Sequence, residues 1–295
     1  MKTAVRVLLA WLVTAMLFPL TACDPPKGSR IVIGAKNFTE QVLLGELLAQ
    51  QIEAQGEKVE RRFYLAGSYI AHQALLSGRI DAYVEYSGTA LSSIFKQPVD
   101  RDRERVRHAI TQLYAQQGVR VMAPLGFENT FAMVMRADNA ARLHVSKLSD
   151  LQTAAPQLRL GVGYEFEERP DGLHGMEQQY HLQFAGAPRV MDLGLLYRAM
   201  ANHQVDIVAG NSTDGAIPTM HLQVLVDDQH YFPPYEAVPV VREDTLRAHP
   251  AVDRALQQLA GKCSEAQMQA MNHAVEGDHR DPADVIRDFR REAGL

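Results

Sequence analysis

The sequence predicts an α/β protein built from two similar lobes with a ligand cleft between them. The chain has 295 residues, more than one small core needs and suited to two lobes. Strand-like and helix-like patterns alternate along it, as they do in α/β proteins. The stretch ALLSGRIDAYVEYS (74–87) is also matched without a gap by AMANHQVDIVAGNS (199–212), 125 residues later. This weak internal repeat pairs Asp81 with Asp206 and Tyr86 with Asn211.

The N-terminus has the pattern of an export signal rather than of a folded element. Lys2 and Arg6 precede an apolar stretch, 7–20, that is too short to span a membrane comfortably. The stretch ends in LTAC, which resembles a bacterial lipobox. The resemblance implies that residues 1–22 are a signal peptide and that Cys23 carries lipid; a plain secretory signal is the alternative.

Residues 23–30 are expected to form a short lipidated tether. Asp24, directly after the cysteine, resembles the signal that keeps lipoproteins at the inner membrane of Gram-negative cells. This implies a protein in the periplasm that is anchored to the membrane by lipid alone. No later apolar run reaches the length of a membrane span.

The composition is that of an ordinary globular protein, and the net charge limits which classes of partner are expected. Hydrophobic residues make up 46% and charged residues 22%. The net charge of −5 argues against nucleic acid as the main partner. Cys23 and Cys263 are the two cysteines, and lipid on the first leaves Cys263 without a partner, so we expect no disulfide.

The first unit reads as a strand, a bend and a helix. The apolar run 31–33 leads into GAKNFTEQ (34–41), and a helix is expected to begin near Asn37 or Thr39. Asn37 and Glu40 have capping-box spacing, and Gly56 is a plausible stop. The apolar stripe of this helix is expected to be Leu44, Leu47, Leu48 and Ile52.

Four bends follow predicted strands and are expected to meet at the cleft, because ligands in open α/β sheets bind beyond the carboxyl ends of strands. These bends are 36–41, 86–89, 163–169 and 211–214. Segments 126–136 and 231–241 are expected to cross between the lobes. Lobe 1 then comprises 31–130 and 235–295, and lobe 2 comprises 131–234. Two helices are expected near the C-terminus, one beginning at Ser264 and the other at Asp281-Pro282 and ending at Gly294.

Aromatic residues gather at these bends. A ring face attracts a cation, and a quaternary ammonium group, which donates no hydrogen bond, suits such a site well. Any one of these rings could simply fill a core, but together they indicate a site for a methylated cation. The rings are Tyr86, Phe131, Tyr164, Phe166, Tyr231, Phe232 and Tyr235.

Polar residues at the same bends suit the other end of a small ligand. Lys36 and Arg169 occupy similar bends of the two halves and could each bind a carboxylate; a salt-bridged surface cation is the alternative. Neutral hydrogen-bonding groups are offered by Thr89, Asn129, Ser212 and Thr213. Asp214 is expected to cap the next helix. Glu85 points to the opposite side of its strand from Tyr86, so we leave it out of the site.

Enzyme signatures are absent from the sequence. It contains no GxSxG, HExxH, GxxxxGK[ST] or paired CxxC motif. The eleven histidines are scattered without metal-ligand spacing. We therefore expect neither an enzyme nor a cofactor or metal site.

Six motifs occur in the order seen in one family. They are GAKNFTEQ, ALLSGRIDAYVEYSGTAL, ENTFAMVMR, DLGLLYRAM, VDIVAGNSTDGAI and DDQHYFPPYEAVPVV. The chain resembles the substrate-binding proteins of ATP-driven osmoprotectant importers, which carry glycine betaine, choline, carnitine and related compounds. The resemblance implies a type II periplasmic-binding-protein fold with a hinge, which closes on its ligand as a monomer. It also implies two partners, a membrane permease and a cytoplasmic ATPase.

The family's ligand residues transfer unevenly. Its aromatic cage corresponds here to Tyr86, Phe131, Asn211 and Tyr235, so one ring has lost its hydroxyl and another ring is missing. The positions that contact a ligand's polar end correspond to Lys36, Thr89, Asn129 and Arg169. The missing ring implies a weakened or altered site. A different small zwitterion, such as an amino-acid derivative, and a ligand-sensing role without transport are the alternatives.

Overall fold

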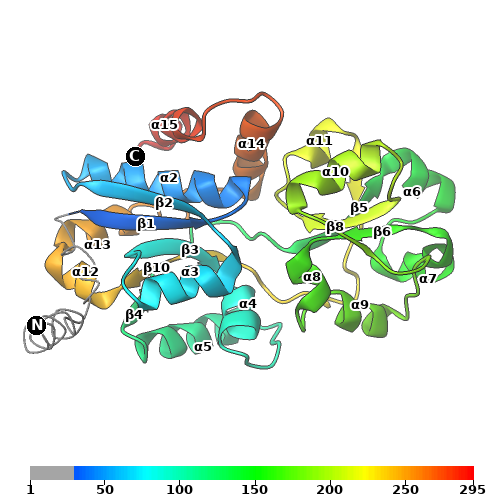
Figure 1. Ribbon diagram of the computed structural model, residues 1–295, viewed down its shortest axis with the longest axis horizontal. Coiled ribbons are helices and arrows are strands. Elements are labelled where there is room, and N and C mark those ends of the chain that lie inside the picture. Colours follow the sequence, from blue (N-terminus) through cyan, green and yellow to red (C-terminus); the bar gives the residue numbers. More distant parts are fainter. Residues whose placement is uncertain (1–29) are drawn as a thin grey trace, which may run out of the picture. The chain divides into compact units, whose positions relative to one another are not determined.

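The structure is a computed structural model that describes residues 30–295. The expected signal peptide, Cys23, Asp24 and all but the last residue of the expected tether lie outside the described residues. Residues 31–295 form one compact unit. Within this unit the strands build two separate sheets of five strands each, shown in Figure 1.

The first sheet has the strand order β2-β1-β3-β10-β4. The inner strand β1 pairs in parallel with β2 and β3, while β10 is antiparallel to β3 and β4. The apolar run of β1 is almost wholly buried, as expected of an inner strand covered on both faces. The strands are β1 (Ile31–Lys36), β2 (Val59–Leu65), β3 (Ala82–Tyr86), β4 (Val119–Val121) and β10 (Ala237–Arg242).

The second sheet repeats this arrangement with the strand order β7-β6-β8-β5-β9. Again two neighbours of the inner strand, β7 and β8, pair with it in parallel, and the remaining pairs are antiparallel. The bounds of β3 and β8 differ by the 125 residues of the sequence repeat, so Tyr86 and Asn211 end equivalent strands. The strands are β5 (Phe131–Arg136), β6 (Leu160–Val162), β7 (Arg189–Val190), β8 (Ile207–Asn211) and β9 (Leu222–Val224).

Two connections link the sheets, because the first sheet takes its strand β10 from beyond all the strands of the second sheet in sequence. The chain enters the second sheet at β5 and returns to the first at β10. Both connecting segments are seen between the two sheets in Figure 1. Each sheet is the core of one of the two predicted α/β lobes. The exact lobe boundaries, at 130/131 and 234/235, stay predictions.

Helices cover both faces of each sheet, so each lobe has two apolar layers. The first sheet is covered by α2 (Thr39–Ala54), α3 (Gly67–Leu76), α4 (Ser87–Thr89), the π-helical turn η1 (Ala90–Ile94), α5 (Arg103–Ala115), α12 (Glu243–Ala248), α13 (Pro250–Gln257), α14 (Glu265–Glu276) and α15 (Pro282–Ala293). The second is covered by α6 (Ala137–Leu143), the short turns η2 (Leu148–Asp150), α7 (Leu151–Ala154) and η3 (Ala155–Gln157), then α8 (Tyr164–Glu168), α9 (Leu173–Tyr180), α10 (Leu193–Ala201) and α11 (Ala216–Thr219).

The helix α2 confirms its predicted stripe and corrects its predicted cap. Leu44, Leu47, Leu48 and Ile52 are all buried. The helix begins at Thr39 with no side-chain cap, so the capping box of Asn37 and Glu40 is wrong. The Glu40 side chain is instead buried in the protein interior, where its carboxylate accepts hydrogen bonds from other side chains.

Both predicted C-terminal helices are confirmed. Ser264 caps α14 in a capping box with Gln267. Asp281 caps α15, which has Pro282 in its first turn and ends at Gly294 in the left-handed conformation. Cys263 lies buried just before α14, and burial raises the pKa of its thiol to about 12.

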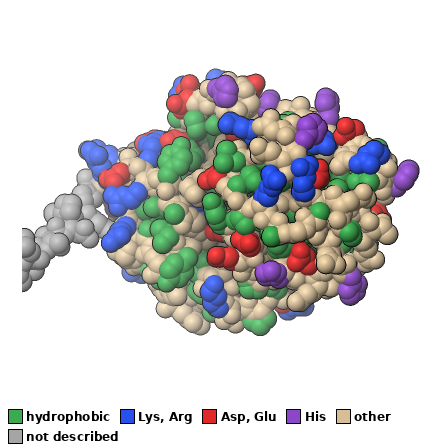
Figure 2. Space-filling view, turned by 45° about the vertical axis from the view of Figure 1, so that its right-hand side comes forward, with side chains coloured by type: hydrophobic (Ala, Val, Ile, Leu, Met, Phe, Trp, Pro, Cys, Tyr) green, Lys and Arg blue, Asp and Glu red, His purple; other side chains and the backbone are tan. Residues whose placement is uncertain are grey.

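The outer surface carries charges of both signs. Figure 2 shows acidic and basic side chains interspersed over one face. No helix among residues 30–295 is long and apolar enough to cross a membrane.

Candidate functional site

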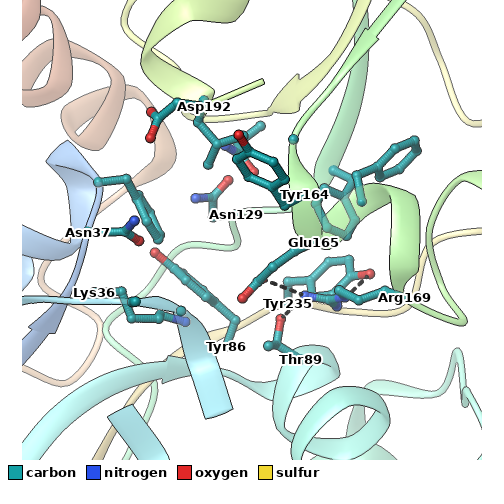
Figure 3. A pocket seen from close by; sticks show the side chains of 18 of the residues that line it. Lys36, Asn37, Tyr86, Thr89, Asn129, Tyr164, Glu165, Arg169, Asp192 and Tyr235 are labelled. Carbon is teal, nitrogen blue, oxygen red and sulfur yellow. Dashed lines mark hydrogen bonds and ion pairs between the residues drawn. The ribbon is translucent and has the colours of Figure 1, made fainter. Parts of the chain in front are cut away.

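A cavity of about 320 Å³ lies at the carboxyl ends of β1, β3, β6 and β8, which is where the sequence places the cleft. Its size is at the lower end for small-molecule sites. Figure 3 shows its side chains converging from elements of both sheets. It is lined by Lys36, Asn37, Phe38, Ala66, Gly67, Tyr86, Thr89, Asn129, Phe131, Gly163, Tyr164, Glu165, Phe166, Arg169, Met191, Asp192, Leu193, Asn211 and Tyr235.

Aromatic rings form much of this lining. Phe131 packs edge-on against Phe166 and Tyr235, with ring centroids 4.9 and 5.7 Å apart. Tyr86 contributes from β3, and Tyr164 and Phe38 contribute from the bends after β6 and β1. Two rings predicted at the cleft, Tyr231 and Phe232, do not line this cavity. The Tyr231 hydroxyl instead donates to two backbone carbonyls of the segment 170–172.

Lys36 ends β1 and is buried beside a carboxylate. Its Nζ lies 2.6 Å from Glu85 Oε1 and donates to Ser68 Oγ. The same nitrogen lies 4.8 Å from the centroid of the Tyr86 ring. As predicted, Glu85 does not line the cavity. Its carboxylate nevertheless pairs with Lys36, which does line it. Strand alternation alone did not predict this pair, because Lys36 and Glu85 lie on neighbouring strands.

Arg169 follows α8 and forms the second buried ion pair of the site. Its guanidinium holds Asp171 with two hydrogen bonds, of 2.6 and 2.9 Å, and donates to Thr89 Oγ1. It also lies over the rings of Phe131 and Tyr235, at 4.8 and 5.5 Å. Burial alone would raise the pKa of Asp171, but the Arg169 guanidinium holds that pKa below its usual value.

Glu40 is the centre of a buried hydrogen-bond network behind the Tyr86 ring. Its carboxylate accepts hydrogen bonds from four side chains on separate segments of the chain. The donors are Tyr86 (2.5 Å), Asn129 (2.9 Å), Thr213 (2.5 Å) and Asn272 (3.2 Å). Burial raises the pKa of Glu40, and these hydrogen bonds oppose the rise. Because Thr213 follows a strand of the second sheet, this carboxylate joins the two lobes.

Asn211 ends β8 opposite Phe131 on the neighbouring strand. Its amide side chain and its backbone N–H both donate to Asp214. Asp214 also accepts from the Tyr197 hydroxyl at 2.6 Å, and burial raises its pKa to about 6. The prediction that Asp214 caps the next helix is wrong, because α11 has no side-chain cap and Asn211 and Tyr197 engage the carboxylate.

Two further polar residues of the lining have unequal surroundings. Asn129 Nδ2 donates to Glu40, while its buried Oδ1 has no hydrogen-bond partner within residues 30–295. Glu165 on α8 is half exposed. One of its oxygens accepts from the backbone N–H of Ser68, and the other lies 3.7 Å from Arg169.

All eight residues that the sequence proposes as ligand contacts line this one cavity. Their contacts with a ligand stay predictions. Sequence reasoning missed Glu40, Asp171 and Glu165, and placed Glu85 without its partner. The available signal was the glutamate of TEQ (39–41) and the four acidic residues of EFEERPD (165–171), which looked like ordinary helix starts. Within residues 30–295, no cluster of three or more histidine, cysteine or acidic side chains is arranged to hold a metal ion.

Comparison with known proteins identifies the family. The family described as the substrate-binding domain of ABC-type glycine betaine transport systems matches residues 29–292. The chain belongs to this family. This binding protein therefore serves as a substrate-binding component of an ABC transport system, and its family is one of transport proteins rather than enzymes.

Relatives and a solved structure agree with this assignment. A glycine-betaine-binding protein of Pseudomonas aeruginosa is 36% identical over 288 residues, which cover 94% of this chain and 92% of the relative. The carnitine transport binding protein OpuCC of Listeria monocytogenes is 32% identical over 287 residues, with the same coverage. The crystal structure of a glycine betaine/carnitine/choline ABC transporter protein is 31% identical, has a TM-score of 0.77, and matches 90% of this chain and 98% of its own. These matches confirm the type II periplasmic-binding-protein fold.

Proposed function

We propose that this binding protein captures a small quaternary-ammonium or betaine-like osmolyte between its two lobes and delivers it to a membrane permease. The carrying observation is the cavity, in which rings from both lobes surround a space of about 320 Å³. The proposed contacts are Lys36, Tyr86, Thr89, Asn129, Phe131, Arg169, Asn211 and Tyr235.

The physical basis is the chemistry of a methylated ammonium group. Such a group carries charge but offers no N–H donor, so ring faces suit it better than hydrogen-bond acceptors do. Each ring contributes roughly 0.5–2 kcal/mol, more when water is excluded. Tyr86, Phe131 and Tyr235 supply three of the four cage positions.

Affinity is expected to be modest, because the fourth cage position is Asn211. Losing one ring weakens binding by about 1 kcal/mol, which is several-fold in the dissociation constant. Part of that loss is recovered if the ligand carries a group that accepts from or donates to the Asn211 amide.

Cellular placement follows from the role. Substrate-binding proteins of ABC importers work outside the cytoplasm, and we propose the periplasm for this one. Lipid on Cys23 and the following Asp24 would hold it at the inner membrane, beside a permease and an ATPase encoded elsewhere. It would act as a monomer.

The test is isothermal titration of residues 30–295 with glycine betaine, choline, carnitine and ectoine, after a thermal-shift screen of osmolytes and amino-acid derivatives. We expect at least one quaternary-ammonium compound to bind with a micromolar dissociation constant. Binding of none of them would overturn the proposed ligand class. Nanomolar binding of choline would contradict the weakened cage.

A further inference from the structure

Both cations of the cavity are already balanced by the protein. Lys36 and Arg169 each pair at 2.6 Å with a carboxylate, Glu85 and Asp171 respectively, whose side chains are fully buried. A buried ion pair leaves little net charge for a third group, and removing either partner is strongly unfavourable. A ligand carboxylate would therefore meet cations whose charge is largely compensated.

Two carboxylates of the lining remain beyond these pairs. They belong to Glu165 and Asp192. In Figure 3 Asp192 lies at the far side of the cavity, whereas Glu165 lies between the Tyr86 ring and Arg169. Glu165 is 3.7 Å from Arg169, whose charge Asp171 already holds at shorter distance. The part of the cavity bounded by rings thus has an excess of negative charge.

The hydrogen-bonding groups show the same bias. The donors of Lys36 and Arg169 are directed to Glu85, Ser68, Asp171 and Thr89. Among the fully buried polar side-chain atoms of the lining, the one that lacks a partner within the described residues is an acceptor, Asn129 Oδ1. The Asn129 amide cannot simply reverse, because its nitrogen donates to Glu40. A ligand hydroxyl can use an acceptor, whereas a ligand carboxylate cannot.

The protein's own cations do not exclude a ligand cation from the rings. Lys36 and Arg169 each lie against rings that also line the cavity. A planar ring has two faces, so a ligand cation can bind the face that Lys36 or Arg169 does not occupy. The paired carboxylates offset the repulsion between these cations and the ligand cation.

We propose that Glu165 selects the ligand by charge, so that the site prefers a methylated cation bearing a hydroxyl over a zwitterion bearing a carboxylate. This rests on the proposed function and narrows it to one ligand class. Glu165 attracts the ammonium group through the field in the cavity and repels a carboxylate. Because it is half exposed, water screens it, and we expect a preference of roughly tenfold rather than several orders of magnitude.

The first experiment uses two ligands that share a trimethylammonium head. Choline has a hydroxyl end and glycine betaine a carboxylate end. Isothermal titration of the wild-type protein at low salt should give a dissociation constant roughly tenfold lower for choline. Added salt should reduce the preference, because the charge that creates it is partly exposed.

The second experiment removes the charge and keeps the contacts. In Glu165→Gln the amide oxygen can still accept from the Ser68 N–H, so the link between α8 and α3 is kept. We expect choline to bind roughly tenfold more weakly and the ratio of the two dissociation constants to approach one. Glu168→Gln is the matched control, since it removes the same charge from the exposed end of α8 outside the cavity and should leave the ratio unchanged. Thermal melting confirms that both variants are folded.

The outcomes separate this inference from the proposed function. Binding of neither ligand would overturn this inference, and it would overturn the proposed function as well only if carnitine and the other screened osmolytes also failed to bind. Binding of glycine betaine as tightly as choline in the wild type would overturn charge selection alone. An unchanged ratio in Glu165→Gln would also overturn it, and so would an equal change in Glu168→Gln, which would indicate a diffuse surface effect.

Discussion

At the scale of single residues, the site is organised by charges that are buried in pairs. Lys36 sits where a strand meets a helix, and Glu85 from the neighbouring strand explains why a lysine is tolerated there. Arg169 is likewise held by Asp171 and by two rings. These pairs fix the orientation of the rings around them, so the cations act first as supports of the aromatic lining.

Asn211 is the residue whose replacement should strengthen the site. It lies beside Phe131 on the neighbouring strand, so a ring in Asn211→Tyr would extend the aromatic lining. We expect quaternary-ammonium compounds to bind several-fold more tightly, by about 1 kcal/mol. Isothermal titration measures this, with Asn202→Tyr on the exposed end of α10 as the control. Unchanged binding in Asn211→Tyr would show that this strand end does not face the ligand, and weaker binding would show that a ring at this position obstructs it.

Asp214 should make stability depend on pH. Burial raises its pKa from 3.8 to about 6, so the folded protein holds a proton there that the unfolded chain releases. Its contribution to stability is therefore fully present below 3.8 and lost as the pH rises through about 6. Between about pH 4 and pH 7 the wild type should lose about 2 kcal/mol relative to Asp214→Asn.

Urea unfolding at a series of pH values measures this difference. Asp138→Asn, at the exposed start of α6, is the control and should follow the wild type. Parallel pH profiles for the wild type and Asp214→Asn would contradict the raised pKa.

At the scale of elements, α14 connects the stability of the first lobe to the site. Asn272 on this helix donates to Glu40 and to the backbone carbonyl of Thr213, and Gln269 donates to the carbonyl of Ser212. A helix of the chain's last segment thus supports the bend after β8. Its N-terminal cap therefore matters beyond the helix itself.

The cap of α14 gives a direct prediction. Ser264→Ala removes the side-chain acceptor of the capping box, and the free energy of unfolding should fall by about 1 kcal/mol. Urea unfolding measures it. Ser77→Ala is the control, because Ser77 bonds to carbonyls at the exposed end of α3 and caps no helix start; its effect should be within a few tenths of a kcal/mol. Equal effects would show that the cap adds nothing.

Elements were predictable where local chemistry decides them. The helices that begin at Ser264 and Asp281 carry their signals in adjacent residues, and both signals are confirmed. The start of α2 was not predicted correctly, because the Glu40 carboxylate accepts hydrogen bonds from Tyr86 and Thr213, which lie far away in sequence. Asp214 failed as a predicted cap because Tyr197 and the nearby Asn211 engage its carboxylate. A local motif holds only while no distant partner offers a better contact.

At the scale of the whole molecule, the lobes are joined by hydrogen bonds across the cleft as well as by the two connections. Glu40 accepts from Thr213, Thr89 accepts from Arg169, and Ser92 donates to Asp171. These contacts favour the closed arrangement. A ligand stabilises closure further only by binding the closed state more tightly than the open one.

Thr213 tests this contribution. Thr213→Val removes one of the four donors to Glu40, and a hydrogen bond to a charged group is worth about 1.5–3 kcal/mol. We expect a larger radius of gyration without ligand in small-angle X-ray scattering and roughly tenfold weaker ligand binding. Thr219→Val is the control, because its hydroxyl bonds within α11. An unchanged radius and affinity in Thr213→Val would show that this bond does not hold the lobes together.

The two-lobed plan could be predicted from the sequence because the repeat preserves a spacing. The 125-residue offset between 74–87 and 199–212 reappears in β3 and β8, and it identified Tyr86 and Asn211 as equivalent. The return of β10 to the first sheet has no local signature. The charge balance of the cavity was equally hidden, since Lys36 with Glu85 depends on which strands become neighbours.

Because Cys263 is buried, the closing of the two lobes can be followed by fluorescence from dyes attached to introduced cysteines. It is the only cysteine in residues 30–295. Because its thiol is buried and stays protonated at neutral pH, we expect it not to react with maleimide reagents. Two dyes can therefore be attached to cysteines introduced on opposite lobes without first mutating the native one. Energy transfer between single pairs of dyes would then follow each closing event as osmolyte is added.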